Sequence, residues 1–526
     1  MRTGPEAASF GPDDLGGWDP AGALGAPGSP PYTRGPHPGR HRAWTVRQLA
    51  DAGSPALANL QLRDLLAAGH TELGVVVDLP TRVGQDSDDP RAKGRVGRAG
   101  VAVDTVADVD ALLAGIPLGE VGLTLDAGLA APALLATVEL VAEDRGVPLH
   151  RLRGALGHDP LGELAVRGTA TMAPASSLRR VVDLVAHCHR LLPGWDPLSV
   201  SGYELREAGA TAGQEVGLAL AHGLAYRQAL RDGGLDLDAA GGRPWASLSA
   251  HNDLFAEVAK LRAARRLWYR LTGRGPAPAA DSGRQLRVHV RTAASTLTAV
   301  QPELNVVRVS VQALAAVLGG AESLHVSATE VPSPATARLA VGIQQVLALE
   351  TGITAEADPL GGSYYLEWLT DAIEAEAAAV VAGVERLGGA VAALETGHTR
   401  AVIEASAYDR ACGVEDGRQV VVGLNRFVEP PVRVPGAAAL DPGDNGGPGG
   451  GDGEARARLL AWRRARPAGA VAAALDALEV AVAGGTDAMA PLAAALGAGA
   501  TLGEATRALG GKPTRRHPGR ASRALG

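Results

Sequence analysis

Short apolar runs alternate along the chain with longer segments in which apolar residues recur at helical spacing. Segments such as residues 208–234 place apolar side chains three or four positions apart, which indicates amphipathic helices. The short runs predict eight strands, at residues 74–78, 121–126, 152–157, 198–203, 245–250, 286–291, 322–327 and 419–424. A strand followed by a helix, repeated in this way, is typical of parallel βα units. The expected fold class is therefore α/β, and the expected architecture is a closed (β/α)₈ TIM barrel.

Polar residues follow most of the predicted strands. The run that ends at Asp78 is followed by the polar residues 79–88, and we expect this loop to cross the mouth of the barrel, where such folds build their active sites. Polar residues also stand at the other strand ends: Asp126, His158, Asp159, Tyr203, Glu204, His251, Asn252, His289, Arg291, His325 and Asn425. Residues of these types also cap helices, so each has a structural alternative to a functional role.

Several predicted strands carry small residues where barrel interiors are normally filled by bulky branched ones. Residues 123–127 read LTLDA, residues 199–203 read SVSGY, and residues 245–250 read WASLSA. Small inward-facing side chains leave space along the barrel axis. We therefore expect an axial tunnel that accepts a long, thin ligand.

The segments that flank the predicted barrel differ from it in composition. Residues 1–43 are rich in Pro and Gly and predict a disordered or extended arm, whereas residues 44–430 hold the barrel. Residues 431–454 predict a flexible linker, and residues 455–526 a helical tail. Basic clusters at residues 463–467 and 513–520 are expected to be solvated, with docking onto an acidic partner as the alternative.

Composition excludes several classes of function. Hydrophobic residues make up 46% of the chain, and a net charge of -7 provides no basic surface for nucleic acid. Cys188 and Cys412 are too few for a disulfide framework or a thiolate metal site, which suits a reducing cytoplasm, and we expect no metal site. No apolar run is long enough to span a membrane, so a soluble protein is expected. The glycine-rich nucleotide-binding motifs are absent as well.

Seven longer motifs carry a family resemblance. They are WTVRQLA (44–50), DLPTRVGQDSDDPRAKGRVGRAGVAVD (78–104), SGYELREAGATA (201–212), AHNDLFAEVAKLRAARRLW (250–268), residues 292–325, DPLGGSYYLEWLTD (358–371) and VVVGLNRF (420–427). In this order they resemble the large, substrate-binding subunit of the methylmalonyl-CoA mutase family. These enzymes are adenosylcobalamin-dependent isomerases that rearrange the carbon skeleton of acyl-CoA thioesters. Residues 500–510 look like the helical tail that follows the family's barrel.

The resemblance implies a barrel whose axis is threaded by the pantetheine arm of coenzyme A. It also implies radical chemistry: a 5′-deoxyadenosyl radical abstracts hydrogen, and the thioester carbon then shifts by one position. The family's cobalamin-binding half carries an Asp-x-His-x-x-Gly motif, which this chain lacks. The resemblance therefore implies that a separate cobalamin-binding subunit delivers the corrin, and a second barrel subunit is a further partner to consider.

Several family site residues are matched in this sequence. Arg167 matches the arginine that pairs with the free carboxylate of methylmalonyl-CoA, although an ordinary helix-surface arginine fits the same spacing. The other matches are Thr45 and Arg47 in the CoA-binding arm, Arg243 and Arg287 as further CoA contacts, Tyr203 beside the substrate, His289 at the barrel mouth, and Glu207 under the corrin.

Other positions depart from the family pattern. Gln85 stands where a tyrosine wedges against the substrate, and Glu204 stands where a histidine donates to the thioester carbonyl, a loss that commonly costs about a hundredfold in rate. Gly157 replaces a glutamine, Trp245 replaces a CoA-contacting serine, Arg291 replaces a glutamine, and Ser327 and Val331 replace two residues that hold the adenosine ribose, with Glu330 close enough to restore the second contact.

Two hypotheses follow from these matches and departures. The first is an acyl-CoA mutase subunit with a changed substrate or an altered catalytic pocket. The second is a catalytically silent subunit that keeps the fold and serves assembly. Arg167, Tyr203 and the CoA arginines favour the first, whereas Glu204 and Gly157 favour the second.

Overall fold

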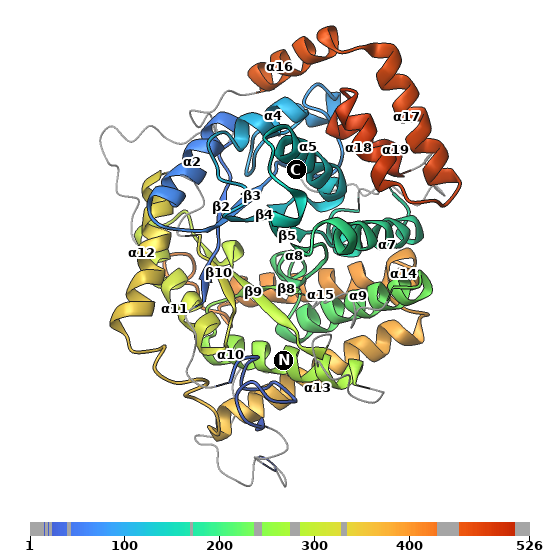
Figure 1. Cartoon of the computed structure of the whole chain (residues 1–526). Helices are drawn as coiled ribbons and strands as arrows, with labels where there is room; N and C mark the ends of the chain where they lie inside the picture. Colours follow the sequence, from blue (N-terminus) through green and yellow to red (C-terminus); the bar gives the residue numbers. More distant parts are fainter. Residues whose placement is uncertain are drawn as a thin grey trace.

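Ten short parallel strands of the described residues lie in the middle of the molecule, and helices surround them (Figure 1). The computed structural model describes residues 15, 19, 24–38, 44–168, 172–235, 245–273, 284–327, 334–428 and 452–510. The strands are β1 (Thr45–Val46), β2 (Gln48–Ala50), β3 (Glu72–Val76), β4 (Gly122–Asp126), β5 (Arg153–Gly157), β6 (Gly194–Asp196), β7 (Ser199–Ser201), β8 (Trp245–Ala250), β9 (Arg287–Thr292) and β10 (Ser323–His325).

Two five-stranded sheets share their edges and so make a ring. One sheet has the order β2-β3-β4-β5-β6 and the other the order β1-β10-β9-β8-β7, and every pair is parallel. Only Arg47 separates β1 from β2, and only two residues separate β6 from β7. Residues 45–50 pair first with β10 and then with β3. Residues 194–201 pair first with β5 and then with β8. The pairing therefore passes through eight chain segments in sequence order, as the predicted (β/α)₈ fold requires.

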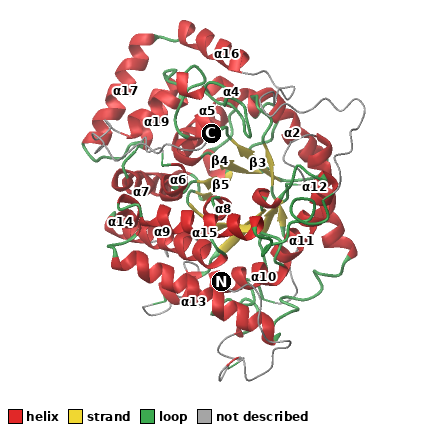
Figure 2. Ribbon diagram, turned by 180° about the vertical axis from the view of Figure 1, so that it is seen from behind, coloured by secondary structure: helices red, strands yellow, loops and turns green. Residues whose placement is uncertain are grey.

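Helices follow the strands and cover the outside of the ring, as the view from behind also shows (Figure 2). They include α2 (Pro55–Ala67), α3 (Leu79–Arg82), α4 (Val106–Leu112), α5 (Ala131–Asp144), α6 (Pro160–Arg167), α7 (Pro174–Leu191), α8 (Gly202–Glu207), α9 (Ala212–Asp232), α10 (Leu254–Thr272), α11 (Asn305–Leu318), α12 (Pro334–Glu350), α13 (Tyr364–Arg386), α14 (Ala390–Glu395) and α15 (His398–Glu415). In the described part of the chain, none of the helices combines the length and the hydropathy that crossing a bilayer requires.

Residues that follow the strands cap several of these helices. Asp78 accepts the backbone N–H of Thr81 at the start of α3, and Asp159 accepts that of Gly162 at the start of α6. Each cap satisfies one of the N–H groups that the first helical turn leaves without a partner. The structural alternative considered for the polar strand ends thus applies to these two aspartates.

Side chains alternate strictly between the two faces of the strands. In β8, Ala246, Leu248 and Ala250 pack outward, whereas Trp245 and Ser247 face the axis. The outward residues of the two sheets join two separate hydrophobic clusters that lie between the strands and the helices. The axis is therefore lined by polar and small residues, as the sequence predicts, and the apolar core lies outside the ring.

Seven of the eight predicted strands are present, and one is wrong. Residues 419–424 form turns with a single bridge between Val422 and Arg426, not a strand. The eighth wall segment is residues 45–50, which pair with β10 on one side and β3 on the other. The strand predicted over residues 198–203 ends at Ser201, and Tyr203 belongs to α8.

The described amino-terminal residues 24–38 form turns that pack against α10 and against the segment before α13. The aromatic side chain of Tyr32 lies edge-on to that of Tyr269, with 5.7 Å between the two centroids, and Arg34 pairs with Asp358. The expectation of a disordered or extended arm is therefore wrong for this part. Of the predicted linker, residues 431–451 lie outside the described residues, and residues 452–454 begin a helix.

Four carboxyl-terminal helices cover the first half of the ring (Figure 1). They are α16 (Asp452–Ala465), α17 (Ala468–Ala483), α18 (Met489–Gly497) and α19 (Leu502–Gly510). Leu492, Leu496 and Leu509 are buried in the same hydrophobic cluster as the residues of β3 and β4. The predicted helical tail is thus part of the barrel's core.

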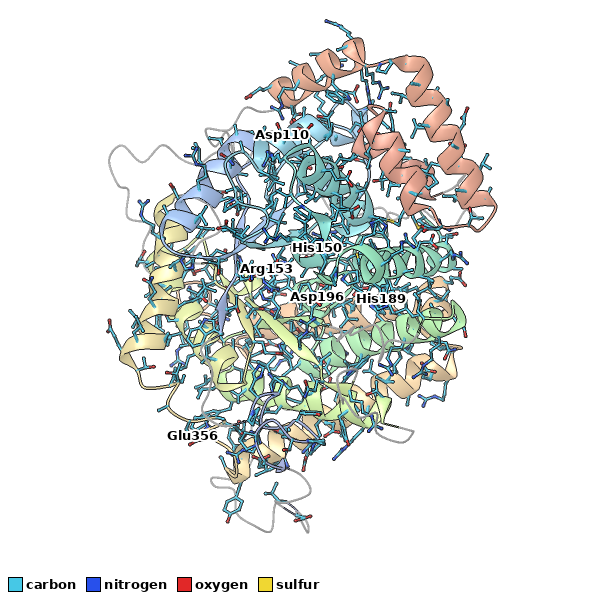
Figure 3. All side chains as sticks on the ribbon, viewed as in Figure 1. Asp110, His150, Arg153, His189, Asp196 and Glu356 are labelled. Carbon is cyan, nitrogen blue, oxygen red and sulfur yellow. The ribbon has the colours of Figure 1, made fainter. Side chains whose placement is uncertain are left out.

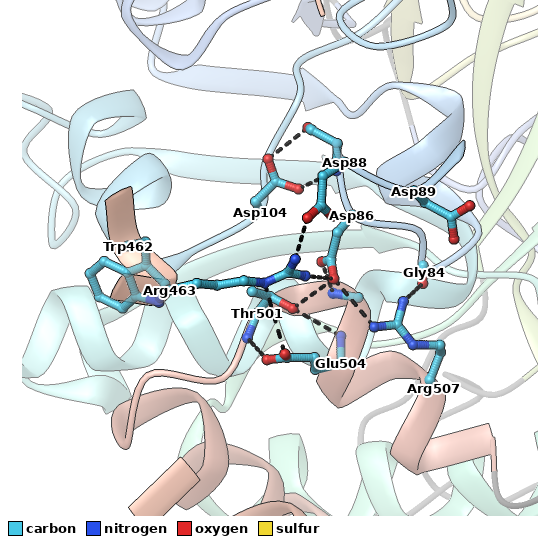
Figure 4. A network of polar contacts seen from close by, with 12 residues as sticks. Gly84, Asp86, Asp88, Asp89, Asp104, Trp462, Arg463, Thr501, Glu504 and Arg507 are labelled. Atoms are coloured by element: carbon cyan, nitrogen blue, oxygen red, sulfur yellow. Dashed lines mark hydrogen bonds and ion pairs between the residues drawn. The ribbon is translucent and has the colours of Figure 1, made fainter. Parts of the chain in front are cut away.

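An ionic network holds this tail to the loop that follows α3 (Figure 4). Buried Asp86 accepts from Arg463 at 2.8 Å, from Arg507 at 3.2 Å and from the Thr501 hydroxyl at 3.0 Å, and Asp88 also pairs with Arg463. The expectation that residues 463–467 are solvated is therefore wrong for Arg463. The second basic cluster, residues 513–520, lies outside the described residues. The network fixes the loop that carries Gln85.

Replacing Arg463 with Met should lower the free energy of unfolding by about 1–3 kcal/mol, because Asp86 would stay buried with one cation fewer. Urea denaturation measures the change. The adjacent Arg464 is exposed, and Arg464→Met should change the free energy by less than about 0.5 kcal/mol. Equal effects of the two substitutions would contradict the proposed anchoring.

Stability should fall as pH rises through the range in which Asp104 ionises. Burial raises the pKa of Asp104 to about 7, although its carboxylate accepts from the Ser87 N–H and hydroxyl. The folded chain therefore binds this proton more tightly than the unfolded chain, and the free energy of unfolding decreases between about pH 4 and pH 7. Asp78, whose pKa burial raises to about 6, acts in the same direction.

Asp104→Asn should flatten this pH dependence, because the amide stays neutral and still bonds to Ser87. Denaturation midpoints at pH 5 and pH 8 for the natural chain and the variant measure the effect. A pH slope that is unchanged in the variant would contradict this account, because Asp104 would then not be the source of the pH dependence.

Candidate active site

Six charged side chains meet at the carboxyl ends of the strands, and we call them the mouth cluster: Arg82, Asp126, Glu163, Arg167, Glu204 and Arg291. Arg82 lies at its centre, at the end of α3. Its Nη1 donates to Asp126 Oδ1 at 2.7 Å, and its Nε donates to Glu163 Oε1 at 2.6 Å. All three residues are buried, so the ion pairs are shielded from water.

Arg167, Glu204 and Arg291 complete the cluster. Arg167 donates to Glu163 at 3.0 Å and to Glu204 at 3.1 Å. Arg291 Nη1 donates to Asp126 Oδ2 at 3.1 Å. The second oxygen of Glu204 lies 3.9 Å from both Arg82 and Arg291. The cluster thus pairs three guanidiniums with three carboxylates.

The pairing keeps Asp126 and Arg82 ionised despite their burial. Burial opposes ionisation of Asp126, but the guanidiniums of Arg82 and Arg291 outweigh it and hold the pKa of Asp126 below its usual value. Burial also opposes the charge on Arg82, yet the three neighbouring carboxylates raise the pKa of Arg82. Charged and desolvated groups of this kind are stable only as a complete set.

Tyr203 lies beside the cluster. The guanidinium carbon of Arg291 stands 4.0 Å above its ring centroid, a cation–π contact. Burial raises the pKa of Tyr203, so its hydroxyl stays protonated. The structure therefore brings together four predicted site residues, Arg167, Tyr203, Glu204 and Arg291.

A small inner cavity of about 30 Å³ lies on the axis beneath the mouth cluster. It is lined in part by the small residues that the sequence analysis singled out, among them Thr124, Ser199, Ser201 and Ser247. Gly157 also lines it, and a Cβ there would stand 2.8 Å from Asp126 Oδ1. The glutamine that the family places at this position does not fit beside Asp126 as it stands.

A larger outer cavity of about 350 Å³ opens at the amino ends of the strands. Thr45, Arg47 and Arg287 line it, as three of the predicted CoA contacts. Arg287 pairs with Asp196 at 2.6 Å, and Asp196 lies near the middle of the view in Figure 3. Arg243, the fourth predicted CoA contact, lies outside the described residues.

Trp245 and His289 line both cavities and separate them. Their rings meet edge to face at 5.7 Å, and the Arg47 guanidinium stands 5.7 Å from the Trp245 ring centroid on the outer side. His289 shares a hydrogen bond with the Ser323 hydroxyl, and burial with neighbouring Arg47 and Arg291 holds its pKa well below the usual value, so its ring is neutral. The axis is therefore hollow at two levels but not continuous, which corrects the expected open tunnel.

The remaining predicted residues lie near the mouth but outside the inner cavity. Glu207 accepts from the Ser295 N–H at 2.8 Å and from its hydroxyl at 3.1 Å. Ser327 follows β10, and its N–H donates to the Thr292 hydroxyl. Gln85 is half-buried in the loop held by the tail, and neither cavity is lined by it. Glu330 and Val331 lie outside the described residues.

The described residues offer no ready-made cluster of metal ligands. They contain no group of three His, Cys, Asp or Glu side chains placed to hold a metal ion. The carboxylate of Glu207, the predicted corrin neighbour, is already bonded to Ser295.

Two members of the mouth cluster were missed by the sequence analysis. Arg82 lies within the motif DLPTR but was not assigned a role, and Glu163 was not considered. A signal for Glu163 was present, because it stands four residues before Arg167 in α6, the spacing of helical ion pairs. Nothing comparable links Arg82 to Asp126, which are 44 residues apart.

Comparisons with known proteins agree with these motifs. The profile of the methylmalonyl-CoA mutase family matches residues 7–514. The chain is 38% identical over 412 residues to the 2-hydroxyisobutanoyl-CoA mutase large subunit of Aquincola tertiaricarbonis, an alignment that covers 77% of this chain and 73% of that protein. It is 38% identical over 421 residues to methylmalonyl-CoA mutase of Rhizobium meliloti and 37% identical over 420 residues to that of Escherichia coli.

The last two alignments cover 79% of this chain but only 59% and 58% of those relatives, so the chain spans little more than half of their length. The relatives named here are acyl-CoA mutases. The match of the family profile along nearly the whole sequence, together with the ring of eight parallel segments, confirms the predicted resemblance: the chain belongs to the methylmalonyl-CoA mutase family.

Proposed function

We propose that this chain is the substrate-binding subunit of an adenosylcobalamin-dependent mutase that rearranges the carbon skeleton of a coenzyme A thioester. The observation that carries the proposal is the axis of the ring, where a cation-lined outer cavity, a narrow waist and a polar inner cavity follow one another toward the mouth cluster. This sequence of environments suits a ligand with phosphates at one end, a slender tether, and a reactive acyl group at the other.

Each level of the axis has a role in this proposal. Arg47 and Arg287 bind the phosphates of coenzyme A in the outer cavity, since guanidiniums match phosphate oxygens in pairs. The pantetheine arm passes Trp245 and His289, and the acyl group lies in the inner cavity below Tyr203. The protein thus binds the thioester, orients it and excludes water around it.

Adenosylcobalamin, when bound, supplies the radical that such rearrangements need. We propose that a separate cobalamin-binding subunit delivers it to the mouth. An exposed apolar surface lies beside the loop after β9, where Gln301 and Arg308 bond to the backbone of residues 422–427. It includes Val300, Leu424, Phe427 and Val428, which are 42–67% exposed. Exposed apolar patches of this kind suit a protein partner.

A second barrel subunit of the same family is a further proposed partner.

Cys188 and Cys412 are both free thiols, and on this ground we place the protein in the cytoplasm.

The silent-subunit hypothesis has one specific observation in its favour. Trp245 stands at the waist between the cavities, packed between Arg47 and His289. A pantetheine arm reaches the inner cavity only if this ring moves. If the Trp245 side chain never moved, the chain would keep the fold of the family but could not admit the thioester to the inner cavity.

Electron paramagnetic resonance separates the two hypotheses. The purified chain is mixed with adenosylcobalamin and a cobalamin-binding subunit of the family, and CoA thioesters are then added. A mutase subunit should give coupled cobalt and organic radical signals with at least one thioester. Tight thioester binding without a radical, for every thioester tested, would favour the silent subunit.

Trp245→Ser should strengthen CoA thioester binding by about tenfold, because the ligand no longer has to break the contacts of Trp245 with Arg47 and His289. Isothermal titration calorimetry measures the affinity. Trp462→Ser, in α16 and away from both cavities, is the matched control and should leave affinity unchanged. An unchanged or weaker affinity of Trp245→Ser would show that the ligand does not pass this residue.

A further inference from the structure

Every guanidinium of the mouth cluster is already neutralised by carboxylates of the same chain. Arg82 is paired with Asp126 and Glu163, and Arg291 is paired with Asp126. Arg167, the residue best placed near the surface to meet a ligand anion, is held by Glu163 at 3.0 Å and Glu204 at 3.1 Å. The cluster therefore has no positive charge left over for an anionic ligand.

The inner cavity is also unfavourable for an added negative charge. Its charged lining residues are two cations, Arg82 and Arg291, and three carboxylates, Asp126, Asp159 and Glu163. His289 adds no positive charge there, because its ring is neutral, and burial likewise lowers the pKa of nearby His158. A ligand carboxylate in this cavity would meet more negative than positive charge.

Glu204 is the member of the cluster that a ligand would most readily compete with. Its side chain is 17% exposed, more than those of the other two carboxylates. One of its oxygens lies 3.1 Å from Arg167, and the other lies 3.9 Å from Arg82 and from Arg291. A single carboxylate of the protein thus stands within 4 Å of three guanidiniums, where a ligand carboxylate would otherwise find its partners.

We infer that Glu204 acts as a built-in carboxylate that makes this site select coenzyme A thioesters with an uncharged acyl group and reject those with an ionised one. The physical reason is that a second carboxylate must either lie close to Glu204 or displace it, and like charges repel strongly when they are brought together in a desolvated site. The inference rests on the proposed function, because it concerns the acyl group of the thioester proposed above.

Isobutyryl-CoA and methylmalonyl-CoA test this inference, because they differ only in a methyl group where the second carries a carboxylate. Calorimetry with the full chain should show isobutyryl-CoA bound at least about tenfold more tightly. Glu204→Gln keeps the size of the side chain and an oxygen for Arg167 but removes the charge. It should strengthen methylmalonyl-CoA binding by about tenfold or more and change isobutyryl-CoA binding by less than about threefold.

Glu404→Gln is the matched control. Glu404 is exposed on α15, where it pairs with Arg400, and its loss changes net charge by the same amount far from the axis. The control should bind both thioesters as the natural chain does. A melting curve for each variant verifies that it is folded.

The outcomes are distinguishable. If the natural chain bound methylmalonyl-CoA as tightly as isobutyryl-CoA, or more tightly, the inference would be overturned and the proposed function would remain. The same would hold if Glu204→Gln bound both thioesters as the natural chain does. Failure of the natural chain and of Trp245→Ser to bind either thioester would overturn the proposed function and this inference with it. The natural-chain comparison needs no variant, so a folding defect in Glu204→Gln does not protect the inference.

Discussion

The mouth cluster joins buried charges that come from α3, β4, α6, α8 and β9, elements spread around much of the ring. Removing one partner from such a set leaves a desolvated charge without compensation, at a cost of about 3–5 kcal/mol. The groups are therefore retained or lost together. This requirement explains why Gly157 has no side chain, since a Cβ would press on Asp126, and why Arg82 is enclosed on all sides by acceptors.

The same electrostatic balance links the fold to the proposed chemistry. Strand alternation sends branched residues outward into two hydrophobic clusters and leaves serines, a threonine and the charged groups on the axis. A polar axis is a poor core but a suitable channel for an amphipathic tether. Arginines stand at both ends of the axis: Arg287 of the outer cavity pairs with the single carboxylate of Asp196, whereas Arg82 at the mouth is shared between Asp126 and Glu163.

Most of the strands could be predicted from the sequence because their signal is local. An apolar run with a polar end, such as residues 245–250, becomes a strand in any α/β barrel that has this order of elements. Residues 45–50 have no such run, since Arg47 and Gln48 interrupt them, and they form a wall segment only because β10 and β3 lie on either side. Residues 419–424 have a local strand signal but no neighbour with which to pair.

The candidate site shows the same difference between features that have a local signal in the sequence and features that depend on contacts between distant residues. The sequence pointed to Tyr203, Glu204, His289 and Arg291 as polar residues near predicted strand ends, and it also indicated the small-residue lining of the axis. Tyr203 and Glu204 lie instead in α8, and His289 lies within β9 at the waist between the cavities, not at the mouth. The partners were not visible, because which carboxylate reaches which guanidinium depends on contacts between residues far apart in sequence, such as Arg82 with Asp126 or Asp86 with Arg463. The block at Trp245 also depends on distant parts of the chain, since the Trp245 ring comes from β8, the His289 ring from β9, and Arg47 from the link between β1 and β2.

A crystal structure of the chain with isobutyryl-CoA tests the account most directly. The account predicts that the phosphates lie beside Arg47 and Arg287, that the pantetheine arm follows the axis past a displaced Trp245 ring, and that the mouth cluster remains paired above the acyl group. A ligand bound on the outer surface, with Trp245 in place and the inner cavity unchanged, would contradict it.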